Sequence, residues 1–234
     1  MSNQRILWGV GTSRTIRPHW ALHELGLAFE LRPILPRTGE TQTPEFTALN
    51  ARQKIPLLQD DGLVLTESAA IITYLSDAYG RDHNRLLPTD TRERARCLEW
   101  CFFVISELDA TSLYVIRRHG DLRHIYGEAP IANEAAAAYF QKQMRTVERT
   151  LDAVPRFILG DRFTAADILL STCVTWAMRY GVRVADTVLA YNERVTARPA
   201  YARALETNAL SSKLDETPSP SLRVTGDLPP APRP

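Results

Sequence analysis

Residues 51–70, ARQKIPLLQDDGLVLTESAA, place a proline between two short apolar runs and end with Glu67 and Ser68 at the expected start of a helix. The N-terminus of a helix has free N–H groups and a partial positive charge, so together with the Ser68 hydroxyl it can bind a carboxylate. Glu67 can pair with an ammonium group. The alternative is that Thr66 or Ser68 only caps the helix. The stretch is therefore a candidate for holding a small acidic peptide.

A second polar stretch, GTSRTIR at residues 11–17, is rich in hydroxyls and arginine. Its hydroxyl residues are Thr12, Ser13 and Thr15. They lie at the expected start of another helix, with Pro18 inside the first turn, where the missing N–H costs little. The loop is therefore a second place where side chains could act on a bound group.

The histidine and cysteine pairs of the chain make poor metal sites. His19 and His23 lie four residues apart but lack the His-Glu-x-x-His order of zinc proteases, and we interpret them as a half-buried helix face. Cys97 and Cys101 have the same spacing, and we expect buried, inert thiols, because a metal would need more ligands. No metal is predicted.

The residues before position 81 predict an α/β unit. An Asp-Gly turn within residues 60–62 joins two short apolar runs, which is the strongest local signal of a β-hairpin. The expected order is strand, helix, strand, short helix, hairpin and helix, over residues 5–10, 18–26, 29–35, 44–51, 55–65 and 67–79. This order predicts a mixed sheet in a thioredoxin-like arrangement over residues 1–80.

The pattern changes after a polar connection at residues 81–90. From residue 91 to about residue 205 there is almost no strand signal, and four runs favour helices. The first run, residues 91–118, is a long amphipathic helix or a bent pair. We therefore expect an all-helical domain over residues 91–210. Residues 211–234 are rich in Pro and Ser and predict a flexible tail.

Composition excludes several classes of protein. The 234 residues are 44% hydrophobic, enough for one large domain or two small ones, and the net charge of +1 favours neither a nucleic-acid surface nor a membrane-binding patch. No apolar run approaches the roughly 18–20 residues of a membrane span, and the first residues lack the pattern of a signal peptide. The odd count of three cysteines argues against a disulfide framework and favours a reducing compartment, so we expect a cytoplasmic protein.

GDRFTAAD, residues 160–167, carries the signature of a helix start. Thr164 can cap the helix, and Asp167 can reach back to the Thr164 N–H, which together form a reciprocal box. Phe163 and Ile168 have the spacing of a hydrophobic staple. The motif predicts a structural role rather than a reactive one.

Taken together, these motifs resemble the glutathione transferase superfamily. Gly-Asp-x-Phe-Thr-x-Ala-Asp before a buried helix is similar to the family's C-terminal domain. Asn-x-x-x-Lys-Ile-Pro, a hairpin and Glu-Ser, in that order, are similar to its N-terminal domain, and residues 11–30 are similar to its first strand–helix unit. The resemblance covers about residues 5–205. It implies the glutathione transferase fold, a thioredoxin-like N-terminal domain followed by an all-α C-terminal domain.

The resemblance implies that glutathione, γ-Glu-Cys-Gly, is the bound co-substrate. The candidate binding residues are Arg14, Gln53, Lys54, Ile55, Pro56, Glu67 and Ser68. In the family, the bond before the proline equivalent to Pro56 is cis and turns the backbone of Ile55 toward the cysteinyl backbone of glutathione. The helix start at Ser68 would hold the γ-glutamyl carboxylate. Gln53 and Lys54 would meet the glycine carboxylate, although Lys54 could equally be a surface charge.

Ser13 is the candidate hydrogen-bond donor to the glutathione sulfur, because family members with a reactive serine place it before this helix. A thiol attacks as the thiolate, and a free cysteine thiol has a pKa near about 8.5. One hydroxyl hydrogen bond and the positive end of a helix could lower that pKa. Thr12 and Thr15 remain alternative donors.

The same loop lacks the cysteine of family members that exchange disulfides and the tyrosine that other members use as donor. Arg14 and Arg17 would add positive charge near the sulfur. Alternatively, they are surface charges or pair with Glu24 or Glu30.

The main hypothesis is a transferase that adds the glutathione thiolate to a small hydrophobic electrophile, as in detoxification. Leu113, Tyr114 and Arg117 are candidate walls for this second substrate, and the alternative for each is a core or subunit contact. The resemblance implies a homodimer, with neither nucleic acid nor membrane as a partner. Two alternatives stay open: a glutathione-dependent isomerase, peroxidase or ether-cleaving enzyme, and a non-catalytic protein-binding relative.

Overall fold

The computed structural model describes residues 5–153, 156–209 and 222–224, and its contacts divide the chain into two units. The N-terminal unit combines the chain up to Leu86 with the segment from Arg198 onward, and the helical unit is Leu87–Ala197. The division falls within the predicted connection at residues 81–90. Residues 198–209 group with the N-terminal unit, which differs from the predicted all-helical domain over residues 91–210.

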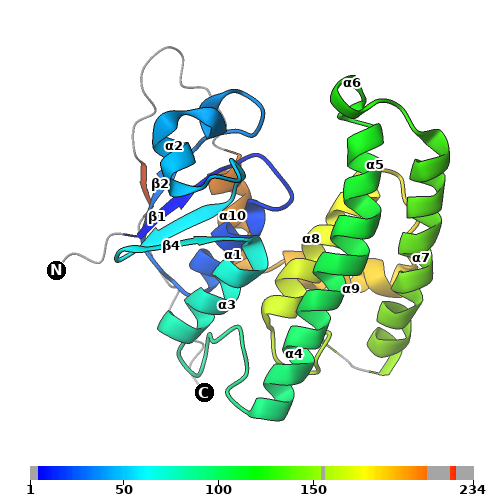
Figure 1. Ribbon diagram of the computed structural model, residues 1–234. Coiled ribbons are helices and arrows are strands. Elements are labelled where there is room, and N and C mark those ends of the chain that lie inside the picture. The colour runs from blue at the N-terminus through cyan, green and yellow to red at the C-terminus, as the bar shows by residue number, and fades with distance from the viewer. Residues whose placement is uncertain (1–4, 154–155, 210–221, 225–234) are drawn as a thin grey trace. The chain divides into compact units, whose positions relative to one another are not determined.

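A mixed β-sheet forms the centre of the N-terminal unit, in the strand order β4-β3-β1-β2-β5 (Figure 1). β1 pairs in parallel with β2, and the other pairs are antiparallel. The elements are β1 (Arg5–Trp8), α1 (Ile16–Glu24), β2 (Phe29–Arg32), η1 (Glu40–Gln42), α2 (Pro44–Leu49), β3 (Leu57–Asp60), β4 (Leu63–Thr66), α3 (Ser68–Tyr79), α10 (Pro199–Asn208) and β5 (Leu222–Val224). The predicted thioredoxin-like arrangement is confirmed. Of the predicted tail at residues 211–234, only β5 lies among the described residues.

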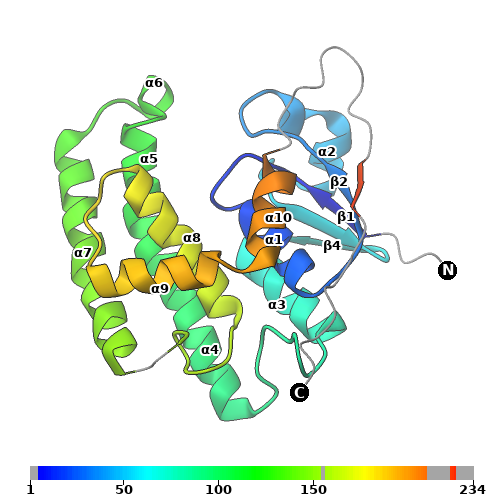
Figure 2. The same cartoon turned by 180° about the vertical axis from the view of Figure 1, so that it is seen from behind.

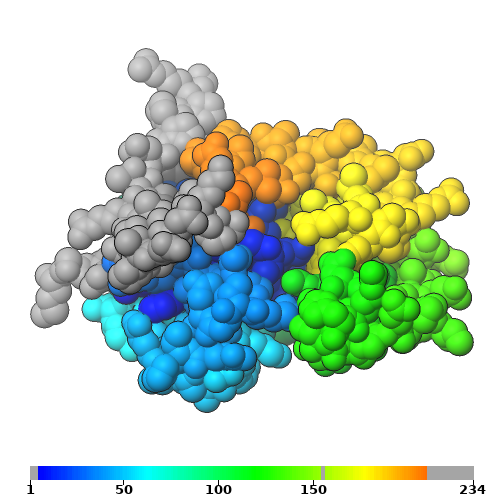
Figure 3. Space-filling view, turned by 90° about the horizontal axis from the view of Figure 1, so that it is seen from above, coloured from blue at the N-terminus to red at the C-terminus, as the bar shows by residue number. Residues whose placement is uncertain are grey.

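The strand register separates two buried layers. Leu7 lies opposite both Leu31 and Leu58, and all three side chains are fully buried. The alternate residue Trp8 faces the other layer, where it packs with Phe46 of α2 and with Leu57. In the space-filling view the light-blue α2 region lies at the surface of this unit (Figure 3). α1 packs against α3 and α10, and these helices enclose the polar residues described next.

Arg198, just before α10, ties this helix to α1 through an ion pair. Its guanidinium donates two hydrogen bonds to the Glu24 carboxylate, at 2.6 and 2.7 Å, and the Trp20 indole donates a third at 2.9 Å. The Tyr201 ring packs against Trp20, with centroids 4.6 Å apart and ring planes tilted by 54°. Among the described residues the ion-pair partner of Glu24 is thus Arg198, and neither Arg14 nor Arg17, which contradicts that part of the alternative considered for the two arginines. Glu30 pairs with Arg32.

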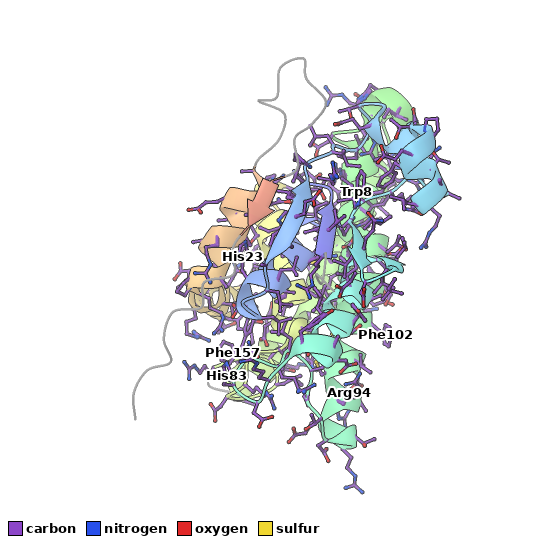
Figure 4. All side chains as sticks on the ribbon, turned by 90° about the vertical axis from the view of Figure 1, so that its left-hand side faces the viewer. Trp8, His23, His83, Arg94, Phe102 and Phe157 are labelled. Carbon is purple, nitrogen blue, oxygen red and sulfur yellow. The ribbon has the colours of Figure 1, made fainter. Side chains whose placement is uncertain are left out.

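His19 and His23 join α1 to α10 from the inside. Both are buried rather than half-buried, because α10 covers the helix face on which they lie. The Gly9 carbonyl can only accept a hydrogen bond, so His19 Nε2, at 3.1 Å, carries the proton. His19 Nδ1 and His23 Nε2 then lie 2.9 and 3.3 Å from the Thr207 hydroxyl. Figure 4 labels His23 beside this helix pair.

Burial makes this histidine pair sensitive to acid. It lowers the pKa of each imidazole from 6.5 to about 4, and Arg203 adds to the effect at His23. Below about pH 6.5 the unfolded chain therefore binds protons that the folded protein does not. We expect the free energy of unfolding to fall as the pH drops from 6.5 toward 4, by on the order of 1–2 kcal/mol per histidine at about pH 5.

Urea titrations at a series of pH values measure this dependence. The double variant His19→Gln/His23→Gln should flatten it, whereas His83→Gln, which changes an exposed histidine, should not. An equal slope in the wild type and the double variant would show that other groups cause the dependence.

The helical unit begins with a continuous helical stretch whose hydrogen-bond geometry changes along the chain. The Asp90 side chain accepts hydrogen bonds from the N–H groups of Arg92 and Glu93 and so caps the start of this stretch. The predicted long helix contains a π-helical segment, η2, between two α-helices. The elements are α4 (Thr91–Phe103), η2 (Val104–Leu113), α5 (Tyr114–His119), α6 (Arg123–Tyr126), α7 (Pro130–Ala153), α8 (Ala165–Arg179) and α9 (Asp186–Thr196). Figure 2 labels the α-helices among them. Across the described ranges, no helix combines the length and apolar character needed to span a bilayer.

α8 is the buried centre of the helical unit. The predicted reciprocal box at its start is confirmed, because Asp167 Oδ2 accepts the Thr164 N–H at 2.8 Å. Asp167 Oδ1 accepts the Ile158 N–H and the Tyr191 hydroxyl, at 2.9 and 2.8 Å. Burial raises the pKa of this carboxyl. The three cysteines are free and buried, as expected.

Asp167→Ala should strongly destabilise the helical unit. The change leaves two N–H groups and the Tyr191 hydroxyl without their acceptor in a fully buried place. We expect a loss of at least about 3 kcal/mol in the free energy of unfolding, measured by urea denaturation. Asp161→Ala, six residues earlier and exposed, serves as control and should change it by less than about 0.5 kcal/mol. Similar losses in the two variants would contradict the structural role of the box.

Candidate active site

The turn at residues 11–15 is held by its own hydroxyls and by the end of α10. The Thr12 hydroxyl accepts the N–H groups of Thr15 and Arg14, at 3.0 and 3.3 Å. The Thr15 hydroxyl accepts the Thr12 N–H at 2.9 Å and donates to Asn208 Oδ1 at 2.7 Å. The Gly11 N–H donates to the Asn208 carbonyl at 2.9 Å. Two of the three predicted hydroxyls therefore hold the turn together.

Ser13 differs from both threonines. Its side chain is half-buried, and its hydroxyl makes no hydrogen bond with the part of the chain that the structure describes. Thr15, in contrast, is fully buried. Among the three candidates, Ser13 is thus the hydroxyl available to a bound group. Its role with sulfur stays a prediction. Arg14 beside it is half-buried and already has an interaction partner.

The start of α3 combines a left-handed residue with free helix N–H groups. Glu67 precedes the helix with φ of 70° and ψ of 116°, a backbone conformation that residues other than glycine rarely adopt. By helix geometry, the N–H groups of Ser68, Ala69 and Ala70 have no partner within α3. Such a helix N-terminus is a suitable binding site for a carboxylate.

Arg17 connects the two helix starts. Its side chain is fully buried, and its guanidinium donates to the Ser68 hydroxyl at 3.3 Å. The expectation of a surface charge at Arg17 was wrong, because α1 is enclosed along its length. The contact places a fixed positive charge beside the free N–H groups of α3.

The segment before β3 lies against the loop after β1. The Ile55–Pro56 peptide bond is cis, as the family resemblance implied. Ile55 packs on the apolar cluster of Trp8 and Leu57, and its side chain lies directly over Gly9. The contacts Gly9–Ile55 and Arg17–Ser68 therefore bring the three predicted stretches together, around residues 9–17, 53–56 and 67–68.

Gln53 and Lys54 present different groups. Gln53 has φ of 53°, and its amide donates to the Thr47 hydroxyl at 3.1 Å. The Lys54 carbonyl accepts a hydrogen bond from the Asn50 side chain at 2.8 Å, and the residue is exposed. Of the two, only Lys54 carries a charge that could pair with a carboxylate, and both roles stay predictions.

Two family models match the chain. They are the glutathione S-transferase N-terminal domain over residues 4–77 and the C-terminal domain over residues 130–206. Glutathione S-transferase 3 of Zea mays is 32% identical over 213 residues, which cover 83% of this chain and 90% of that protein. The chain belongs to the glutathione S-transferase family.

Other members of the family agree with this assignment. Glutathione S-transferase 2 of Anopheles gambiae is 34% identical over 145 residues, which span 61% of this chain and 65% of that protein. The theta class glutathione S-transferase from Xanthomonas axonopodis pv. citri, solved with glutathione bound, is 25% identical, with a TM-score of 0.73 over 87% of this chain and 97% of that one. The chain is thus a member of an enzyme family with this fold.

Sequence reasoning missed Arg52 and Asn208 in this transferase. Arg52 donates to the Glu67 carboxylate at 3.1 Å and to the Thr66 hydroxyl. Both members of the Arg52–Glu67 ion pair are largely exposed, so the pair orients Glu67 more than it stabilises the fold. The signal in the sequence that could have identified Arg52 is its position inside the Asn-x-x-x-Lys-Ile-Pro motif, between Asn50 and Lys54. Nothing in the sequence pointed from Asn208 to residues 11–15.

The predicted second-substrate residues lie in the helical unit. Leu113, the last residue of η2, is fully buried, whereas Tyr114 and Arg117 on α5 are half-buried. The Arg118 guanidinium lies 5.7 Å from the Tyr114 ring centroid. The burial of Leu113 is consistent with a core contact rather than a substrate contact. The roles of all three residues in substrate binding stay predictions.

Gly9→Ala should destabilise this transferase more than a matched glycine variant. Gly9 has φ of +106°, and an added Cβ would lie 2.5 Å from Ile55 Cβ. Gly39 has φ of +94° with open space around it. In both variants the alanine must adopt a left-handed backbone conformation, which lowers the free energy of unfolding by about 1–2 kcal/mol. Only Gly9→Ala must also displace Ile55, which lowers it by about 1–3 kcal/mol more. Equal losses in urea denaturation would contradict the close contact between Gly9 and Ile55.

Proposed function

We propose that the protein is a glutathione transferase that binds glutathione along residues 53–68 and uses Ser13 to stabilise its thiolate. The observation that carries this proposal is the hydroxyl of Ser13. Among the residues that the structure describes it has no hydrogen-bond partner, whereas the hydroxyls of Thr12 and Thr15 are bonded, and Arg17 links α1 to the start of α3. The glutathione bound to the related theta class enzyme supports the choice of ligand.

Each end of glutathione has a suitable partner in this proposal. The γ-glutamyl carboxylate binds the Ser68 hydroxyl and the free N–H groups of α3, with the buried Arg17 charge beside them. Glu67, oriented by Arg52, pairs with the γ-glutamyl ammonium group. The backbone at Ile55 and Pro56 pairs with the cysteinyl residue. Lys54, with Gln53 beside it, meets the glycine carboxylate.

The chemistry is nucleophilic attack by sulfur. The thiol of glutathione loses its proton to solvent, and the Ser13 hydroxyl and the dipole of α1 stabilise the resulting thiolate. Lowering the thiol pKa by about two units requires roughly 2.7 kcal/mol of preferential stabilisation, a magnitude within reach of these two contributions. The thiolate then donates its electron pair to a carbon of the electrophile to form the C–S bond, and a leaving group departs with the displaced pair. Proximity provides the rest of the rate enhancement.

The second substrate in this proposal is a small apolar electrophile. Tyr114 and Arg117 on α5 are half-buried, and they offer a ring and a charge that could contact it. The chain acts as a homodimer in a reducing, cytoplasmic compartment. The edge strand β4, with Leu63 and Val64 partly exposed, and the three free cysteines support these two points.

Ultraviolet absorbance of the thiolate in the glutathione complex tests the proposal. Ser13→Ala should raise the pKa of the bound thiol by about one to two units and lower kcat/KM at neutral pH by about 10–100-fold. Ser13→Thr, which keeps a hydroxyl, should retain much of the band. Ser68→Ala should instead weaken glutathione binding by about 5–30-fold and leave the thiol pKa in place.

A non-catalytic protein predicts different results. Glutathione binding without a thiolate band would contradict conjugation and favour a scaffold. No detectable binding would favour a protein-binding relative.

A further inference from the structure

Asn208, the last residue of α10, contacts the turn at residues 11–15 from the opposite end of the chain. Its Oδ1 accepts the Thr15 hydroxyl at 2.7 Å, and its Nδ2 lies 3.4 Å from the Thr12 carbonyl. Its backbone carbonyl accepts the Gly11 N–H at 2.9 Å. One residue thus contacts the turn through an acceptor, a donor and its main chain.

The Asn208 side chain also determines the direction of the hydrogen bonds inside the turn. The Thr15 hydroxyl has one proton and three acceptors within reach: Asn208 Oδ1 at 2.7 Å, and the Thr12 carbonyl and hydroxyl, each at 3.0 Å. The shortest contact takes the proton. The lone pairs of Thr15 Oγ1 then accept the Thr12 N–H and the Thr12 hydroxyl.

The chain of bonds continues toward Ser13. With its proton directed to Thr15, Thr12 Oγ1 accepts the N–H groups of Arg14 and Thr15. These hydrogen bonds fix the backbone before and after Ser13, while the Ser13 hydroxyl takes no part in the network within the described residues. Such chains of hydrogen bonds strengthen one another, so the loss of the final acceptor weakens each of them.

We propose that Asn208 is a positioning residue for Ser13, which fixes the turn so that the Ser13 hydroxyl points at the glutathione sulfur. This inference rests on the proposed function. Asn208 itself touches neither glutathione nor the electrophile. It acts through Thr15 and Thr12 as the terminal acceptor of their hydrogen bonds.

Asn208→Ala is the informative change, because it removes the side chain and keeps the backbone bond to Gly11. The Thr15 hydroxyl then turns to the Thr12 carbonyl, which already accepts the Ile16 N–H at 3.2 Å. Glu206→Ala is the matched control. Glu206 lies two residues earlier on the same helix and is exposed, so its loss leaves the bonds of Asn208 and the contacts between α1 and α10 in place.

Two measurements on the full chain carry the test. Hydrogen exchange of the amides at residues 11–16 should be at least about 5-fold faster in Asn208→Ala and unchanged in Glu206→Ala. The thiolate fraction of bound glutathione at neutral pH, and kcat/KM with it, should fall about 3–10-fold in Asn208→Ala, with a glutathione KM within about 2-fold of wild type. The pH profile of kcat/KM should shift to higher pH only in that variant.

The outcomes separate the two proposals. If Ser13→Ala abolishes the thiolate band while Asn208→Ala keeps the wild-type thiol pKa, the positioning role is wrong and the proposed function stands. Unchanged exchange at residues 11–16 in Asn208→Ala would also overturn the positioning role. If Ser13→Ala leaves the band intact, the proposed function fails, and the positioning role fails with it.

Discussion

Helix α1 is buried along its whole length, and this single constraint organises the N-terminal unit. All nine of its residues are buried, and four of them carry polar or charged side chains. A buried polar group without a partner costs about 1–3 kcal/mol, so each of these side chains must be satisfied by another part of the chain. The four are Arg17, His19, His23 and Glu24. Their partners come from α3, from the loop after β1, and from the segment around α10.

The candidate site inherits its geometry from these contacts. Arg17 holds the start of α3 beside α1, and His19 holds the carbonyl of Gly9, the residue over which Ile55 packs. Thr15 then ties the turn before α1 to Asn208. The groups proposed to bind the γ-glutamyl end, the cysteinyl backbone and the sulfur of glutathione are thus fixed by contacts of one helix. This is a form of preorganisation, which reduces the entropy lost on binding.

Local signals in the sequence were sufficient for much of the N-terminal unit. The Asp-Gly turn between apolar runs predicted the β3–β4 hairpin, and the spacing of Thr164 and Asp167 predicted the box at the start of α8. Both depend on residues close together in the chain, whose geometry local chemistry decides. The cis bond before Pro56 came from the family resemblance, because the residue types alone would have favoured a trans edge-strand proline.

The predictions that failed concern which elements meet. An amphipathic pattern shows that α10 buries one face but not against which partner, so residues 198–209 were placed in the helical domain. The burial of His19 and Arg17 was missed for the same reason, since their covering helices lie far away in sequence. The hydroxyls of the turn could be recognised as a set. Their division into two that hold the turn and one that is available depends on Asn208, about 195 residues later.

The polar contacts between α1 and α10 are better explained by specificity than by stability. Replacing buried charged groups by apolar ones of similar volume is often neutral or stabilising, so an apolar α1 could hold α10 about as strongly. Apolar surfaces, however, tolerate small shifts along and around the helix axis. The ion pair Glu24–Arg198 and the hydrogen bond that His19 Nδ1 accepts from the Thr207 hydroxyl fix both the shift and the rotation of α10. That register brings Asn208, at the far end of α10, within 2.7 Å of Thr15. A shift of one residue would rotate Asn208 by about 100° and remove it from the turn.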